Sequence, residues 1–184
     1  MPYTQMLFTA ITVLSIAGSQ EPPSTAPSHT KQNCRLIKAE VLVPKGWELL
    51  EEDKGSLVLV SITKNGKPAE FQNVGVGILM MKNAPVKLGV PISQYIKKVK
   101  DQVAGAGKVL SLNEMNKGPF RCLRAEFIGP REDGKLLHIL SLTIGNEKTG
   151  TMFSAVATSF DSDWKNDREQ MEPILQAFEP SEAE

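Results

Sequence analysis

The chain offers few side chains for acid–base chemistry. Its two histidines are His29, in a stretch rich in proline and serine, and His138, which lies among apolar residues. A lone imidazole between apolar neighbours is more often packed against the core or its rim than catalytic. No G-x-S-x-G turn, which would present a serine nucleophile, accompanies it. The sequence therefore predicts a protein that is not an enzyme and that holds no cofactor.

Asp161, Asp163 and Asp167 have a spacing that partly fits a calcium-binding loop. The next ligand position, however, is Lys165, and the position that requires glycine is Asn166. Carboxylates are favoured near the positive end of a helix dipole. We therefore expect these residues to cap a helix, and we predict no metal site.

Cys34 and Cys122 are too few for a structural zinc site and can form one disulfide at most. In an oxidising compartment they would form it if their Cα atoms came within about 4.4–6.8 Å of each other. The alternative is that both stay free, with Cys122 as a small buried hydrophobe and Cys34 near the end of the domain. The sequence favours neither over the other.

Trp47 and His138 are the residues that we single out as possible contacts for a partner or ligand. Trp47 follows the turn Pro44-Lys45-Gly46. From there the indole can plug the edge of a sheet against a helix, or it can stack on a ligand. Its large apolar area favours packing.

The first twenty residues contain no charged side chain, and residues 7–18 are almost wholly apolar. This run is shorter than the roughly 20 residues that cross a bilayer, but it is typical of a secretory signal peptide. Small residues at positions 17 and 19 predict cleavage before Gln20. We therefore expect a periplasmic or secreted protein with no stable membrane anchor. Its predicted parts are a signal peptide (1–19), a disordered spacer (20–33), one domain (34–180) and a C-terminal tail (181–184).

Charge is balanced along the chain. The 21 Lys and Arg residues equal the 21 Asp and Glu residues in number, so the formal net charge is zero. Proteins that bind nucleic acid have a net basic domain. We therefore expect no nucleic-acid partner.

Short runs of β-branched and apolar residues, separated by turn-forming pairs such as Asn65-Gly66, predict a strand-rich domain. Such turns join antiparallel neighbours. We expect strands over 35–43, 47–52, 56–63, 71–81, 108–114, 120–128, 136–144 and 151–160. Both faces of the fourth strand are apolar, which indicates a central strand covered on two sides by helices.

Two windows have helical periodicity. The first begins at Ile92 and ends at Gly105 or Gly107, and the second begins near Ser162. The first has apolar residues at Ile92, Tyr95, Ile96, Val99 and Val103. The second places Trp164, Arg168, Met171, Leu175 and Phe178 along one stripe. Pro173 predicts a kink or a short break in the second helix. Together the elements predict an α+β protein with a central, mostly antiparallel sheet and helices on both faces.

Three stretches carry a resemblance to a known family. They are the turn Val43-Pro44-Lys45-Gly46-Trp47, the amphipathic helix from Ile92, and the closing strand 152–159 with the helix end Glu172-Pro173-Ile174-Leu175-Gln176-Ala177-Phe178. This order of elements resembles the PsbP-like and DcrB-like family over about residues 34–180. The resemblance implies an α/β/α sandwich, and family members mostly act without catalysis.

The resemblance and the expected export together imply a non-catalytic extracytoplasmic module that binds or assists an unidentified protein partner in the cell envelope. Envelope members of the family are often lipoproteins, whereas the first cysteine here is Cys34, well after the apolar run. The alternative is an exported hydrolase or small-ligand carrier with a pocket between sheet and helix. Converging polar groups in a pocket would favour that alternative, and a flat apolar patch would favour the partner-binding module.

Overall fold

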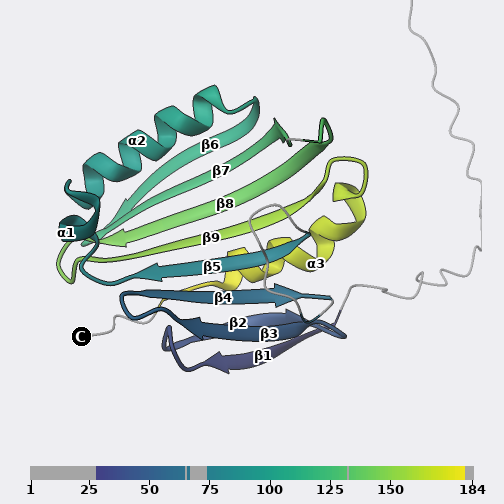
Figure 1. Cartoon of the computed structure of the whole chain (residues 1–184), viewed down its shortest axis with the longest axis horizontal. Helices are drawn as coiled ribbons and strands as arrows, with labels where there is room; N and C mark the ends of the chain where they lie inside the picture. Colours follow the sequence, from purple (N-terminus) through teal and green to yellow (C-terminus); the bar gives the residue numbers. More distant parts are fainter. Residues whose placement is uncertain (1–27, 65, 67–73, 132, 181–184) are drawn as a thin grey trace, which may run out of the picture.

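The computed structural model describes residues 28–64, 66, 74–131 and 133–180. The elements are β1 (His29–Cys34), β2 (Ala39–Pro44), β3 (Glu48–Asp53), β4 (Leu57–Thr63), β5 (Gly75–Met81), α1 (Ala84–Leu88), α2 (Ile92–Gly105), β6 (Lys108–Lys117), β7 (Phe120–Pro130), β8 (Leu136–Asn146), β9 (Thr151–Phe160) and α3 (Trp164–Ala177). Seven strands form one antiparallel sheet in the order β3-β4-β5-β9-β8-β7-β6, and β1 and β2 form a separate hairpin (Figure 1).

The two long helices cover opposite faces of the large sheet. Successive residues of a strand point to opposite faces, and in β7 Leu123 packs with Ile92 and Ile96 of α2. Its neighbour Cys122 packs instead against the cluster that contains Met171 of α3. The chain is therefore an α/β/α sandwich of the α+β class, as the sequence predicts.

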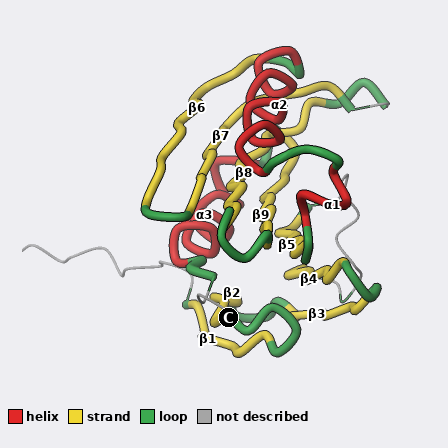
Figure 2. Tube along the Cα trace, turned by 90° about the vertical axis from the view of Figure 1, so that its left-hand side faces the viewer, coloured by secondary structure: helices red, strands yellow, loops and turns green. Residues whose placement is uncertain are grey.

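The β1–β2 hairpin adds to the layer that contains α3. Val41 and Val43 of β2 are buried in the same apolar cluster as α3, and His29 Nε2 of β1 lies 2.8 Å from the backbone oxygen of Gln170. Figure 2 shows the hairpin on the α3 side of the molecule, away from α2.

The position of β1 corrects two expectations. Residues 29–33, expected to be part of a disordered spacer, are strand, and the strand expected over 35–43 is interrupted by a turn at 35–38. The polar sequence of β1 hides it, because a strand at the edge of a two-stranded sheet exposes most of its side chains. The signal peptide (1–19) and the tail (181–184) lie outside the described residues, and the division into these parts stays a prediction.

The remaining elements differ from expectation mainly at their ends. Strands β3 to β9 occupy the expected stretches, although residues 71–73 lie outside the described part of the chain. The five-residue helix α1 is too short to show a period. Helix α3 is continuous through Pro173, so the short break considered there is wrong, and the alternative of a kink stays a prediction. The N-cap of α3 is Asp163, whose side chain makes no capping hydrogen bond; its backbone oxygen accepts N–H bonds from Asn166 and Asp167 instead.

No helix in the described part of the chain is long and apolar enough to cross a membrane.

The face of α2 that packs on the sheet can be tested by substitution. Ile96 is buried against Leu123, whereas Lys98 is exposed. We expect Ile96→Ala to lower the free energy of unfolding by about 2–4 kcal/mol, as a large-to-small change in a core does. Lys98→Ala should change it by less than about 0.5 kcal/mol. Equal effects of the two substitutions in urea denaturation would show that α2 packs through a different face.

Candidate functional site

Trp47 packs at the edge of the sheet against a helix, the role that its large apolar area favours. Only 7% of the residue is exposed, and its Nε1 donates a hydrogen bond of 3.0 Å to Oε1 of Gln170 on α3. Lys64 Nζ lies 5.3 Å from the centre of the ring, which allows a cation–π contact. Trp47 thus joins the start of β3 to α3. Its contact with a partner or ligand stays a prediction.

His138 is buried, with 5% exposed, between two carboxylates. Its Nε2 lies 2.9 Å from Glu126 Oε1, and its Nδ1 lies 3.2 Å from Asp161 Oδ1. The ring stacks on Trp164, with ring centres 4.1 Å apart and planes 9° from parallel. Both nitrogens are therefore engaged, and neither is available as a base for a substrate.

The serine opposite His138 is not a nucleophile either. Ser159 pairs with His138 across β8 and β9, but it is completely buried, and its hydroxyl donates to Asp167 Oδ2 at 2.5 Å. Lys64 Nζ forms an ion pair with Asp167 Oδ1 at 3.4 Å. These groups satisfy one another, so this constellation holds α3 on the sheet and offers no place for a substrate.

An ion-pair network extends from His138 along α3. Arg168 Nη1 lies 3.5 Å from Glu126, and Arg168 Nε and Arg124 Nη2 each lie 2.7 Å from Glu172. The hydrogen bond from Arg168 lowers the pKa of Glu172 from its usual value. Because the pKa of Glu172 is lower in the folded than in the unfolded chain, its ionisation stabilises the fold at a pH above the ordinary glutamate pKa. This stabilisation is lost as the pH falls through the lowered, folded-state pKa.

No disulfide joins Cys34 and Cys122 in the structure. Cys34 is buried and Cys122 is half-buried, and both belong to or pack against the apolar cluster on the α3 side of the sheet. Burial, with a smaller effect of the nearby Glu51 carboxylate, raises the pKa of Cys34 to about 12. The disulfide is therefore not formed here, and its formation in exported protein stays a prediction.

Thiol alkylation tests both statements about the cysteines. At about pH 9 a thiol with a pKa of about 12 is only about one-thousandth thiolate, and Cys34 is also buried, whereas Cys122 is half-buried and therefore more accessible to the reagent. We expect iodoacetamide to modify Cys122 in the folded protein and Cys34 only after denaturation. Mass spectrometry counts the additions. Two unreactive cysteines in the denatured, unreduced protein would instead demonstrate the bridge.

A large groove is lined by residues of the β1–β2 turn, the β8–β9 turn and the end of β5. We call it the basic groove. These segments lie at one end of the sheet, on the left in Figure 1. Its volume of about 1110 Å³ is slightly larger than the roughly 300–1,000 Å³ of most ligand sites. It is lined by Leu36, Ile37, Lys38, Met80, Lys82, Asn83, Pro119, Phe120, Asn146, Lys148, Thr149, Thr151 and Phe153. The alternative function weighed from the sequence would use a pocket between sheet and helix, whereas this groove lies between the end of the sheet and its hairpin turns.

The charge of the basic groove is one-sided. Lys38, Lys82 and Lys148 come from three separate segments, and none of the described residues that line the groove is acidic. Among the described residues, no carboxylate lies within ion-pair distance of Lys82 or Lys148. A concave wall with one sign of charge concentrates the field and attracts anions.

Hydrogen bonds hold two walls of the basic groove in place. The Glu51 carboxylate accepts the backbone N–H groups of Arg35 and Leu36, at 3.3 and 2.9 Å, and so fixes the β1–β2 turn to β3. Asn146 Oδ1 accepts the backbone N–H of Lys148 at 2.9 Å and shapes the β8–β9 turn. The groove is therefore formed before any ligand arrives.

Lys38 and Asn83, on two walls of the groove, have unusual backbone conformations. With φ of 50° and 53°, they are the only non-glycine residues of the described chain with positive φ. At nine other such positions the chain uses glycine, which adopts this conformation without steric cost. Asparagine tolerates it better than lysine does. Backbone strain of this kind is concentrated at functional sites. The two residues therefore favour this groove as the candidate functional site.

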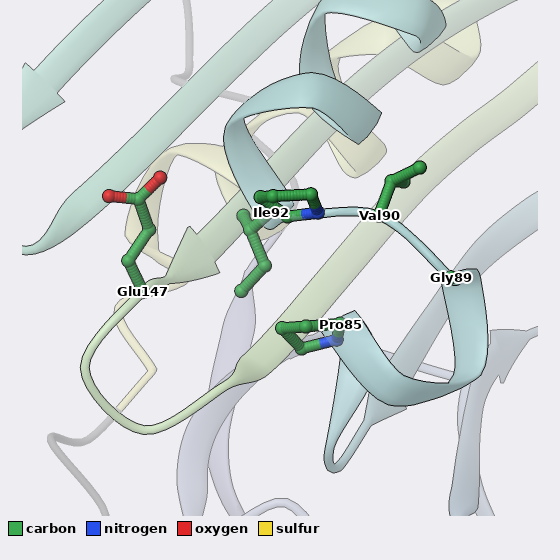
Figure 3. Close-up of a pocket in the computed structure, with 6 residues that line it drawn as sticks. Pro85, Gly89, Val90, Ile92 and Glu147 are labelled. Atoms are coloured by element: carbon green, nitrogen blue, oxygen red, sulfur yellow. The ribbon is translucent and has the colours of Figure 1, made fainter.

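A second, smaller hollow of about 500 Å³ lies next to α1 and the start of α2 (Figure 3). It is lined by Pro85, Gly89, Val90, Pro91, Ile92 and Glu147. The backbone N–H of Ala84 donates to the oxygen of Gly150 at 2.8 Å, which joins α1 to the β8–β9 turn. The hollow thus adjoins the turn that also lines the basic groove.

Comparison with known proteins gives a likeness in fold. No protein-family model and no curated protein matches the chain. Solved structures do. The fold resembles that of cyanobacterial PsbP. The PsbP of Synechocystis sp. PCC 6803 is 12% identical, with a TM-score of 0.49, over 91% of this chain and 98% of that protein.

Two other solved structures have a similar degree of likeness. LpqN of Mycobacterium tuberculosis, which is involved in cell envelope biogenesis, is 15% identical over 85% of this chain and 84% of its own, with a TM-score of 0.43. A Pseudomonas aeruginosa protein of unknown function is 13% identical over 84% and 99%, with a TM-score of 0.48. At these identities the likeness concerns the fold, and what this chain binds is argued from its own residues.

The sequence reasoning identified Trp47 and His138 but missed the basic groove. Its lysines lie far apart in the sequence and follow no motif. The positive φ of a groove lysine is visible only in the structure. Turns usually place glycine at positive φ, and nothing in the sequence marks a lysine that adopts this conformation.

Proposed function

We propose that the protein is a non-catalytic, extracytoplasmic module that binds a protein partner of the cell envelope through the basic groove. The observation that supports it most directly is the preformed groove, with three lysines and two strained backbone positions on its walls. Catalysis has less support, because His138 and Ser159 are buried and engaged with carboxylates.

Affinity capture from the native host tests the proposed function. The bait is the mature chain, and the partner is read by mass spectrometry. The double variant Lys82→Glu/Lys148→Glu reverses the charge of the groove. The control Lys97→Glu/Lys98→Glu makes the same change on exposed positions of α2. We expect a partner that the wild type and the control retain and the groove variant loses. Retention by all three baits would contradict binding through the groove.

Export is tested separately by the intact mass of protein recovered from outside the cytoplasm of its host. The uncharged apolar run and the small residues before Gln20 predict a mature chain that begins near Gln20. A cytosolic product that retains residues 1–19 would contradict the extracytoplasmic part of the proposal.

The volume of the groove and its converging lysines also favour the small-ligand carrier as a second candidate. Native mass spectrometry of protein purified from its host distinguishes the two. A bound small molecule of constant mass, lost in the Lys82→Glu/Lys148→Glu variant, would replace the protein partner as the occupant of the groove.

A further inference from the structure

We propose that the basic groove recognises an extended, acidic segment of the partner that also carries an apolar side chain. This inference rests on the proposed function and specifies the chemistry of the partner. It follows from charge, from shape and from the backbone of the groove walls.

The charge of the groove selects an anion. Lys38, Lys82 and Lys148 surround one recess without an acidic residue among its described lining, in a chain whose total charge is zero. An acidic partner gains from all three ammonium groups, and it also gains from the low-dielectric walls between them. A basic or neutral segment would leave Lys82 and Lys148, which have no ion-pair partner among the described residues, without a counter-charge.

The shape of the groove calls for more than an isolated anion. Phe120 and Leu36 are partly buried apolar residues of the lining, and Phe153 and Met80, which also line the groove, are buried. A volume of about 1110 Å³ far exceeds a single phosphate or carboxylate group. An apolar side chain next to the acidic ones would cover Phe120 while the carboxylates reach the lysines.

A membrane surface fits this groove less well than a peptide does. A bilayer is met by protruding apolar side chains, whereas the lysines here line a recess. The large apolar residues that are most exposed in the described chain, Val86, Leu110, Met115 and Leu136, all lie outside the lining. Thr149, Thr151 and Asn83 supply polar groups for the backbone of an extended segment.

The strained backbone supports a role for the side chains at the groove walls. Glycine at position 38 would relieve a φ of 50° but would remove the ammonium group. Lys38→Gly therefore separates the two properties: we expect it to preserve the fold and to weaken binding of an acidic ligand. A simple structural role of Lys38 would give neither a loss of binding nor a charge dependence.

The experiment measures fluorescence anisotropy of labelled pentapeptides with the mature chain. The acidic probe is Glu-Asp-Phe-Glu-Asp. One control, Gln-Asn-Phe-Gln-Asn, lacks the charges, and another, Glu-Asp-Gly-Glu-Asp, lacks the aromatic ring. We expect the acidic aromatic probe to bind on the order of tenfold more tightly than either control. Added salt should weaken its binding, because ions screen charges beyond about 8 Å at physiological strength.

Protein variants assign the binding to the groove. Lys82→Glu/Lys148→Glu should weaken binding of the acidic probe on the order of tenfold or more, and Lys38→Gly should weaken it less. The exposed-helix control Lys97→Glu/Lys98→Glu should leave it unchanged. Equal loss in that control, equal binding of the uncharged peptide, or no binding of the acidic probe would overturn the inference.

Two further outcomes separate this inference from the proposed function. If the groove variant loses the captured partner but no acidic peptide binds the wild type, the groove binds a partner of other chemistry and only this inference fails. If capture does not depend on the groove, the proposed function fails. Co-sedimentation with phosphatidylglycerol vesicles that requires Lys82 and Lys148, without peptide binding, would assign the groove to an anionic membrane surface.

Discussion

Trp47→Ala should lower the free energy of unfolding by about 3–5 kcal/mol, the range for truncation of a buried tryptophan or phenylalanine. Trp47 is buried at the start of β3 and bonds through Nε1 to Gln170 of α3. Its removal leaves a cavity between the edge of the sheet and α3, and it also leaves the Gln170 amide without this donor. Urea denaturation followed by circular dichroism measures the change.

Two variants separate the ring of Trp47 from its hydrogen bond. Gln170→Ala removes the acceptor on α3 and should cost about 0.5–1.5 kcal/mol, as a single hydrogen bond does. Trp47→Phe keeps most of the apolar area and should fall between the two. If Gln170→Ala cost as much as Trp47→Ala, the indole would act as a hydrogen-bond donor rather than as a plug for the sheet edge.

The sequence predicts most of the fold because the central elements have strong periodicity. Strand β5 shows apolar residues on both faces, and α2 shows a single apolar stripe; in the structure, Ile78 is buried on one face of β5, and Ile92 and Ile96 are buried under α2. Local pattern suffices wherever burial repeats with the period of the element.

The elements that the sequence missed are those whose burial is set by distant contacts. Strand β1 reads as polar because only Cys34 at its end is fully buried, and β2 supplies all of its strand pairing. At Pro173 the local rule predicts a kink or a short break, and the break does not occur. Ile174 and Leu175 beside it are buried against the sheet, so tertiary packing keeps α3 continuous.

The surroundings of a candidate site residue were predictable only where its own residue type and its sequence neighbours determine whether it is buried. The burial of Trp47 follows from its area, and a satisfied His138 follows from its apolar neighbours. The carboxylates that engage His138 come from different elements, Glu126 from β7 and Asp161 from the residue after β9. The lysines of the basic groove likewise meet only in the folded chain, because three turns gather at one end of the sheet.

His138→Ala should lower the free energy of unfolding by about 2–4 kcal/mol. Removing the ring leaves the buried Glu126 carboxylate without its hydrogen-bond partner, which costs about 1–3 kcal/mol for a neutral group and more for a charged one. Arg168 remains 3.5 Å from Glu126 and compensates part of its charge. Loss of the ring also removes its stacking contact with the buried indole of Trp164. Because Trp164 Nε1 has no hydrogen-bond partner in the described structure, no hydrogen bond from Nε1 offsets the lost stacking contact.

The two carboxylates beside His138 provide an internal control. The Asp161 side chain is 39% exposed and that of Glu126 only 13%, so water can replace the ring at Asp161 but not readily at Glu126. Asp161→Asn should therefore cost no more than about 1 kcal/mol, as exposed ion pairs do. Thermal and urea unfolding measure both variants. If Asp161→Asn lowered the free energy of unfolding as much as His138→Ala, the stabilising contact of the ring would be the one with Asp161. If neither substitution changed it, the ring would contribute no net stability to the attachment of α3.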